Sequence, residues 1–459
     1  MRLILSRYEY STLWNMSGRY FSSKGEQIFM KSKLVTFLGL VALTLVGCGG
    51  TKTEAPDTGK ETEAPKTDVT PAQKDELVIG SPTAHQEFVK GEVEKFLKAE
   101  GLDSKYTVKM YELGEADAKG VADWTAATAP DIYAFASDQI GTLNNKGALA
   151  EVPEAFATKM VEDMGELAAG AGVLGDSTYA YPYAGDNGYF LYYNKSLVAQ
   201  DKIGNVNDLI AACAEKGTKF AYALDTDSSF FSIGTFMTFG ARYTVNLNTD
   251  GSFLSATSTF NTEAGIKGGK AVKSLLANAN VITAHKSARD VVPNAANGIG
   301  AIVEGSWKYN AYKEALGENL GLAALPTITI DGETKNFASF LGYKLYGVNP
   351  KKSGGNAERL TVLHKIANYL VSATAQEARF DALNVVPTNA SVKKLQKVQN
   401  NELVAALAAQ SAYSVPQTVV PGNVWSGASA AVDSLKAADS DVAQVMATYA
   451  STIASSTGY

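Results

Sequence analysis

Two periodicities of hydrophobic and polar residues alternate along most of the chain, beginning at residue 76. Short apolar runs typical of buried strands are followed by segments with the 3.6-residue period of amphipathic helices. This succession predicts a parallel α/β sheet with right-handed crossovers. The predicted strands are 76–80, 106–112, 130–135, 180–185, 190–194, 220–225, 300–305 and 320–326. The predicted helices are 86–100, 205–217, 262–279, one that begins at 307, and, in the mostly helical last part, 357–373, 401–410, 426–438 and 440–451.

The length of this patterned part predicts more than one core. About 385 residues follow residue 75, and 46% of the whole chain is hydrophobic, which suffices for two sizeable cores rather than one. We therefore expect two lobes.

An uncharged apolar run, residues 34–46, follows the basic stretch Met30-Lys31-Ser32-Lys33. The run fits a signal peptide and is shorter than the ~20 residues of a spanning helix. Leu45-Val46-Gly47-Cys48 resembles the lipobox of bacterial lipoproteins, in which the cysteine is lipidated. A buried helix with a chance cysteine is the alternative, but the polar segment that follows has almost nothing to bury. We interpret 30–47 as a lipoprotein signal peptide, Cys48 as the lipidation site and 48–75 as a disordered tether.

Residues 1–29 precede this second possible start at Met30. Lys24-Gly25-Glu26 can be encoded as a ribosome-binding sequence at a suitable distance from a start codon for Met30. We therefore expect residues 1–29 to be a non-native extension.

Charge and cysteine content exclude some classes of protein. Six of the 41 basic and two of the 47 acidic residues precede Cys48, which leaves 35 against 45 and a net charge of −10. Nucleic acid is therefore not an expected partner. Once Cys48 is lipidated only Cys213 remains, so no intrachain disulfide is expected.

Signatures of catalysis are mostly missing from the sequence. Ser391-Val392-Lys393-Lys394 matches S-x-x-K, but no K-T-G accompanies it, and the start of a lysine-rich helix explains it better. His85, His285 and His364 do not have the spacing of metal ligands. We expect a protein that is not an enzyme and that holds no metal or cofactor.

Four segments together resemble a known family. They are "AATAPDIYAFASDQIGTLNNKGALAEV" (126–152), "YAYPYAGDNGYFLYYNKSL" (179–197), "GIGAIVEGSWKYNAY" (298–312) and "VPQTVVPGNVWSGASAAV" (415–432). Their order and spacing are similar to those of the extracellular solute-binding proteins of ABC transporters, specifically the maltose/maltodextrin-binding group. The resemblance covers nearly everything from residue 76 to the end. It implies the α/β periplasmic-binding-protein fold, with two lobes, each a mainly parallel sheet flanked by helices, joined by a hinge.

A sugar ring has rims of hydroxyls and faces of C–H groups, so its site needs hydrogen-bond acceptors and flat aromatic rings. Asp138, Asp186, Trp307, Tyr309 and Trp425 provide such a set. The resemblance implies that the two aspartates bind hydroxyls and that the two tryptophans stack on sugar faces. The alternatives are a helix cap for Asp138, a turn for Asp186 and core positions for the tryptophans.

The chain departs from the family pattern at several positions that the resemblance places in the site. They are Phe135 where tryptophan is frequent, Gln139 where arginine is frequent, Asp186 in place of glutamate, Phe230 in place of tyrosine, and His85 and Gln86 in the first loop. These changes favour longer maltodextrins or another oligosaccharide over maltose itself.

We therefore expect a monomeric, lipid-anchored receptor on the extracellular face of the membrane that delivers an oligosaccharide to the permease of an ABC importer. Residues 76–184 with 324–373 are predicted to form the N-terminal lobe, and 188–323 with 374–459 the C-terminal lobe. Two alternatives remain: a lipid-anchored glycosidase, and the same fold binding ferric ion through Tyr192 and Tyr193.

Overall fold

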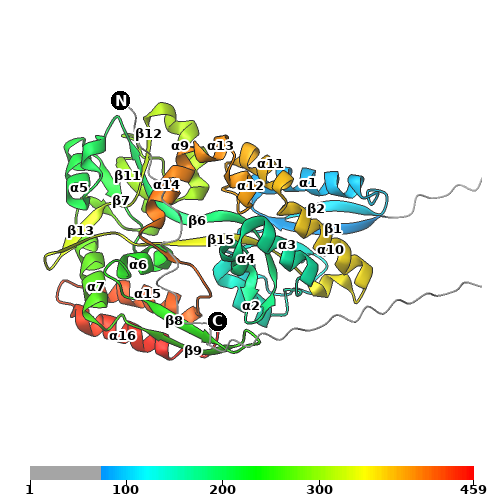
Figure 1. Cartoon of the computed structure of the whole chain (residues 1–459). Coiled ribbons are helices and arrows are strands. Elements are labelled where there is room, and N and C mark those ends of the chain that lie inside the picture. The colour runs from blue at the N-terminus through cyan, green and yellow to red at the C-terminus, as the bar shows by residue number, and fades with distance from the viewer. Residues whose placement is uncertain (1–73) are drawn as a thin grey trace, which may run out of the picture. The chain divides into compact units, whose positions relative to one another are not determined.

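The structure of the protein, a computed structural model, describes residues 74–459 (Figure 1). The predicted extension, the signal peptide, the lipidation site Cys48 and nearly all of the tether lie outside the described residues. Among the helices of residues 74–459, none is both long and apolar enough to cross a membrane.

Ten strands form the principal sheet of the described residues. The order is β10-β7-β11-β6-β15-β3-β1-β2, with β12 also paired to β6 and β16 to β15. Their bounds are β1 Asp75–Ser81, β2 Tyr106–Glu112, β3 Ile132–Ala136, β6 Ala180–Asn194, β7 Lys219–Ala221, β10 Val281–Ile282, β11 Ile299–Gly305, β12 Leu320–Ala323, β15 Ser339–Val348 and β16 Ser414–Pro416.

Two parallel groups of strands are joined by long antiparallel strands. β1 pairs in parallel with β2 and β3, and β7 pairs in parallel with β10 and β11. Between the groups, β6 and β15 run antiparallel to each other, β15 to β3, and β6 to β11. Figure 1 shows β6 and β15 side by side along this junction. The predicted α/β class with mainly parallel pairing is confirmed.

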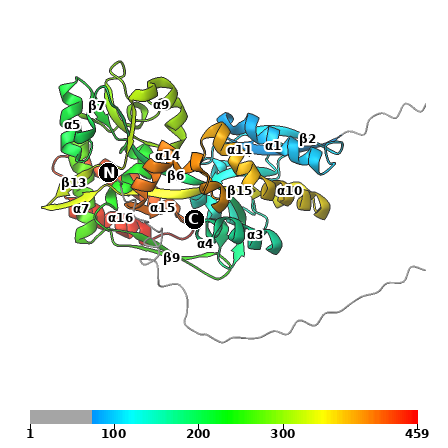
Figure 2. The same ribbon diagram turned by 45° about the horizontal axis from the view of Figure 1, so that its top comes forward.

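Helices cover this sheet, and about half of them form where the amphipathic pattern predicts a helix (Figure 2). In α1, for example, Val89, Val93 and Leu97 are buried along one face at the period of a helix. The helices are α1 Gln86–Ala99, α2 Ile140–Asn145, α3 Glu154–Met164, α4 Glu166–Ala169, α5 Val206–Glu215, α6 Ser229–Phe236, α7 Glu263–Leu276, α8 His285–Ala288, α9 Tyr309–Leu316, α10 Ala357–Leu370, α11 Ala373–Leu383, α12 Ala390–Lys393, α13 Gln396–Gln399, α14 Glu402–Ser411, α15 Gly422–Leu435 and α16 Val442–Ala454.

The elements that were not predicted are β10, β15, β16, three small hairpins and the helices α3, α4, α6, α8, α11 and α13. In addition, β6 was predicted as two strands. The predicted strands 180–185 and 190–194 are one continuous strand, because Gly185 and Gly188 lie within the extended chain instead of ending it. The hairpins are β4 Val173–Leu174 with β5 Ser177–Thr178, β8 Tyr243–Leu247 with β9 Phe253–Ser258, and β13 Thr327–Ile330 with β14 Glu333–Asn336.

Two large clusters of buried side chains lie at opposite ends of the long strands. The first cluster contains Leu77, Val93 and Ile132, and the second contains Phe220, Ile302 and Val432. β6 contributes to both, through Tyr181 and Tyr183 in the first cluster and residues 189–193 in the second. Ala323 and Leu325, on either side of the predicted lobe boundary, both pack against the second cluster. The predicted division of the chain between lobes stays a prediction.

Three segments pass from one cluster to the other. In β15, Phe340 belongs to the second cluster and Tyr346 to the first. Between α11 and α12, Val385 belongs to the first cluster and Val386 to the second. Together with β6, these are called the crossing segments below.

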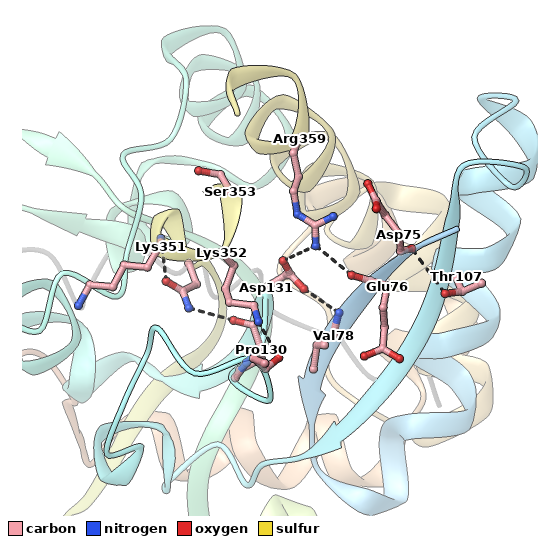
Figure 3. Close-up of polar contacts among 12 residues, drawn as sticks. Asp75, Glu76, Val78, Thr107, Pro130, Asp131, Lys351, Lys352, Ser353 and Arg359 are labelled. Carbon is pink, nitrogen blue, oxygen red and sulfur yellow. Dashed lines mark hydrogen bonds and ion pairs between the residues drawn. The ribbon is translucent and has the colours of Figure 1, made fainter. Parts of the chain in front are cut away.

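Asp131, immediately before β3, holds the edge of the first cluster together (Figure 3). It is fully buried, and its carboxylate accepts a hydrogen bond from the Val78 backbone N–H at 2.7 Å. Its other oxygen pairs with the Arg359 guanidinium of α10 at 2.8 Å, and that guanidinium also donates to the Glu76 carbonyl at 2.9 Å. Burial nevertheless raises the pKa of Asp131, against the lowering effects of Val78 and Arg359. The carboxylate thereby joins β1, β3 and α10.

Candidate functional site

Residues of β6 and β15, together with the loop after β2, the turn after β3 and residues beside the second cluster, line a cavity of about 560 Å³. This volume lies within the ~300–1,000 Å³ that is usual for small-molecule sites. The lining residues are Gly114, Glu115, Ala116, Asp117, Lys119, Ala136, Asp138, Gln139, Asn187, Asp227, Ser229, Phe230, Arg289, Trp307, Lys344, Gln417 and Trp425.

One wall of the cavity is polar and comes from the loop after β2 and the turn after β3. The buried Gln139 side chain holds the loop in place, because its carbonyl accepts from the Lys119 backbone N–H at 2.8 Å and its amide donates to the Glu115 carbonyl at 2.5 Å. This wall therefore presents the side chains of Glu115, Asp117 and Asp138 to the cavity.

Asp138 is the buried acid of this wall. It follows directly from β3 in the 3-10 turn Ser137–Gln139, where its side chain is buried. Burial, opposed by the Lys119 ammonium, raises the pKa of Asp138 to about 7. Near neutral pH the carboxyl group therefore exists in both states, as an acceptor when ionised and also as a donor when protonated.

The opposite wall is aromatic. The Phe230 ring of α6 lies 6.2 Å from the Trp307 ring, between centroids, and 5.6 Å from Phe340, on which it stacks. Trp425 of α15 lies 6.0 Å from the same Phe340 ring. Trp307 follows Gly305, and a Cβ atom at residue 305 would overlap the indole, so the close approach of this ring requires glycine there. Trp307 remains 39% exposed, so part of its ring is accessible to a ligand in the cavity that it lines.

Two cations lie against these rings. The Arg289 guanidinium is 4.7 Å from the centre of the Phe231 ring and 5.9 Å from that of Trp307. Its Nε donates to Glu304 at 2.8 Å, which fixes its direction. From the polar wall, the Lys119 ammonium lies 5.7 Å from the centre of the Trp425 ring. All three cation-to-ring distances are within the range of cation–π attraction.

The floor of the cavity comes from β6, β15 and the segment after β16. The Asn187 amide donates to the Gln417 side-chain carbonyl at 2.7 Å. Lys344 lies beside them with only 3% of its surface exposed, and its ammonium is 2.9 Å from the Asp186 carboxylate. Burial alone would lower the pKa of Lys344, but the carboxylates of Asp186 and Glu115 outweigh it and raise the pKa. Lys344 therefore stays protonated at the floor, as the partner of the Asp186 carboxylate.

The structure brings half of the predicted site residues together at the cavity. Asp138, Gln139, Phe230, Trp307 and Trp425 line it. His85, Gln86, Phe135, Asp186 and Tyr309 are not among the lining residues.

The residues that do not line the cavity have other partners. Phe135 is fully buried in a smaller cluster, beside Tyr133 at 5.7 Å between ring centroids. Tyr309 donates its hydroxyl to Glu402 at 2.9 Å. Asp186 is buried behind Lys344, where it pairs with that ammonium instead of facing the cavity.

His85 and Gln86, at the start of α1, lie just outside the lining set. The Gln86 amide donates to the Ser81 carbonyl at 3.3 Å. His85 Nδ1 is 3.8 Å from the Glu115 carboxylate, which does line the cavity. Burial lowers the pKa of His85, although Glu115 opposes this.

The tyrosines of the ferric-ion alternative lie elsewhere. Tyr192 is fully buried in the second cluster, and its hydroxyl donates to the Gly305 carbonyl at 3.0 Å. Tyr193 is buried in the same cluster. Neither residue lines the cavity.

Sequence reasoning missed several lining residues. The loop "LGEADAKG" after β2 combines glycine with alternating acids and a lysine, which was a usable signal for Glu115, Asp117 and Lys119. Arg289 and Lys344 come from segments without a predicted element, so nothing directed attention to them. The further missed residues are Asn187, Asp227, Ser229 and Gln417.

Two curated relatives resemble the chain over nearly its whole length. A galactooligosaccharide-binding protein of Bacillus subtilis (strain 168) is 24% identical over 432 residues, which cover 91% of this chain and 94% of the relative. The maltodextrin-binding protein MdxE of the same organism is 24% identical over 421 residues, 87% of this chain and 91% of the relative.

A solved structure of another protein has a similar fold. The solved structure of the maltodextrin-binding protein MalE1 from L. casei BL23, without ligand, matches with a TM-score of 0.67 and 21% identity, over 84% of this chain and all of that one. This likeness shows a shared two-lobe fold. The model of the bacterial extracellular solute-binding protein family matches residues 92–406, so this chain, with its cavity of aromatic and polar walls, belongs to the bacterial extracellular solute-binding proteins.

Proposed function

We propose that the protein captures an oligosaccharide of the maltodextrin type in this cavity. The observation that carries the proposal is the pairing of an aromatic wall, with Phe230, Trp307 and Trp425, and a polar wall with Asp138 and its neighbours. Aromatic rings pack against the C–H faces of sugars, while carboxylates and amides bind the hydroxyls at the rim. The names of both B. subtilis relatives, which refer to oligosaccharides, support the same class of solute.

The magnitudes are sufficient for a transport receptor. A hydrogen bond to a charged group contributes about 1.5–3 kcal/mol, and an aromatic contact about 0.5–1.5 kcal/mol beyond its buried area. Three or four contacts of each kind, less the cost of association, allow a dissociation constant in the micromolar range, about −8 kcal/mol.

We propose further that the bound form delivers the sugar to the permease of an ABC importer from the outer face of the membrane. A ligand that contacts both walls favours the closed arrangement of the lobes, and that arrangement is the signal for the permease. Lipidation of Cys48 would keep the receptor at the membrane. The sequence Leu45-Val46-Gly47-Cys48 supports this part of the proposal. A Cys48→Ser variant that still fractionates with membranes as the parent does would contradict it.

A panel of sugars tests the solute class. We expect maltotriose, maltotetraose or longer α-1,4-linked chains to raise the melting temperature, since a ligand at 100 times its Kd stabilises a protein by about 2.7 kcal/mol. β-linked galactooligosaccharides form the matched comparison, and stabilisation by them alone would redirect the proposal to that class. The recovered sugars should keep their chain length; shortened chains would favour the glycosidase alternative.

A further inference from the structure

One carboxylate, that of Asp186, touches all three crossing segments. It lies on β6, and one of its oxygens is 2.9 Å from the Lys344 ammonium on β15. The other oxygen accepts a hydrogen bond from the Val386 backbone N–H, in the third crossing segment, at 3.1 Å. The neighbouring Gly185 N–H donates to the Val386 carbonyl at 2.9 Å, which closes a small ring of contacts around this point.

Asp186 also forms a hydrogen bond with the segment that carries Trp307 of the aromatic wall. The Ser306 hydroxyl donates to the Asp186 carbonyl at 2.6 Å, and Ser306 immediately precedes Trp307. A shift of β6 relative to β15 therefore changes the position of the segment that carries the Trp307 ring.

Lys344 belongs both to this junction and to the cavity. It lines the cavity floor, while its ammonium pairs with Asp186 and lies within the field of Glu115 on the polar wall. The contact with Asp186 is an ion pair rather than an aligned hydrogen bond. An ammonium has three N–H donors and no acceptor, so this pair leaves donors for an oxygen in the cavity.

We propose that Lys344 is a positioning and specificity-determining residue, whose ammonium donates a hydrogen bond to a hydroxyl of the bound sugar while its pairing with Asp186 holds the three crossing segments together. A sugar bound in the cavity then contacts the same side chain that joins the crossing segments, about which the lobes move. The sugar contact rests on the proposed function; the tie between the crossing segments does not.

The binding experiment compares two buried ion pairs. Lys344→Met removes the ammonium at similar length, and Arg359→Met is the matched control, because it breaks the buried Asp131 pair, whose residues do not line the cavity. Calorimetric titration with maltotetraose should show affinity about 10- to 100-fold weaker for Lys344→Met, the loss of one hydrogen bond from a charged group. The affinity of Arg359→Met should stay within about twofold of the parent. Parental affinity in Lys344→Met would overturn the sugar contact.

A double variant separates binding from folding. Lys344→Met alone leaves Asp186 as an unpaired buried charge, which destabilises the fold. Lys344→Met with Asp186→Asn removes both charges and keeps a side-chain oxygen for the Val386 N–H. We expect this double variant to regain most of the lost melting temperature but none of the lost affinity. Recovery of parental affinity would show that Lys344 acts only through folding and would overturn its role in specificity.

Hydrogen–deuterium exchange without sugar tests whether the Lys344–Asp186 pair holds the three crossing segments together. In Lys344→Met, amides of residues 184–188, 341–345 and 384–387 should exchange faster than in the parent, while those of β1 and β3 should not. Unchanged exchange in the three segments would overturn the tie. If the parent binds neither maltodextrins nor galactooligosaccharides, the proposed function and the sugar contact are both contradicted. The exchange data alone would then test whether Lys344 holds the three crossing segments together.

Discussion

Asp131 and Asp186 are both buried aspartates that pair with one cation and one backbone N–H, yet their surroundings differ. Asp131 joins β1, β3 and α10 within the first cluster, and its partner Arg359 does not line the cavity. Asp186 joins the crossing segments, and its partner Lys344 lines the cavity floor. Burying a charge is costly in both places. What distinguishes the candidate functional pair is therefore not burial or pairing, but what the cation faces on its other side.

Breaking the scaffold pair should produce the largest effect on stability. Arg359→Met leaves the Asp131 carboxylate buried without its cation, so the free energy of unfolding should fall by about 3–5 kcal/mol. Urea denaturation, with the slope compared to that of the parent, measures this loss. A loss below about 1 kcal/mol would show that the pair behaves like an ordinary surface salt bridge.

The two tryptophans should separate binding from packing. Trp307 is 39% exposed, so Trp307→Ala should weaken maltotetraose binding by about 1–3 kcal/mol with little change in the melting temperature without sugar. Trp425 also packs against the second cluster, so Trp425→Ala should lose similar affinity and melt lower as well.

Calorimetric titration beside melting curves decides between these outcomes. Trp124, which is buried in the smaller cluster and does not line the cavity, offers the opposite control: Trp124→Ala should melt far lower while the folded fraction binds normally. Parental affinity in both the Trp307 and Trp425 variants would show that the aromatic wall is structural.

Asp138 should give an effect that is visible only as a pH dependence. Its pKa in the folded protein is raised to about 7 by burial, above the ordinary value near 4. Between these values the folded state holds a proton on Asp138 that the unfolded state releases. The contribution of this carboxyl group to the free energy of unfolding is therefore highest at low pH and falls as the pH rises towards 7. The slope should reach at most about 1.4 kcal/mol per pH unit.

The matched control for this pH effect is Asp138→Asn, measured without sugar. Subtracting its stability curve from that of the parent isolates the contribution of the carboxyl group. A difference curve that is flat from pH 4 to 8, or that rises with pH, would contradict a raised pKa at this position.

Much of the fold could be predicted from the sequence, because most strands and helices carry a plain period. β15 could not, since Gly342, Lys344 and Gly347 interrupt its apolar pattern. These same residues fit the structure: the lysine is neutralised by Asp186, which lies on a different strand and 158 positions earlier in the chain. Such a pairing is a tertiary contact, and no local pattern reports it.

In the candidate site, too, some residues could be predicted from the sequence and others could not. Trp307, Trp425 and Phe230 could be found because rings near polar turns or at family positions are informative. Phe135 was misleading because both faces of β3 are buried, so its side chain enters a core instead of the cavity. Asp186 was predicted to bind the sugar, and its neighbour Asn187 does line the cavity. Asp186 itself lies behind Lys344, which lines the cavity instead.

Small-angle scattering with and without maltotetraose tests most directly whether the cavity closes around a sugar between the two clusters. The account predicts a smaller radius of gyration at saturation in the parent and in Arg359→Met, because a ligand that contacts both walls draws them together. Calorimetry on the same samples establishes saturation. An unchanged radius of gyration in a sample that has bound maltotetraose stoichiometrically would contradict the account.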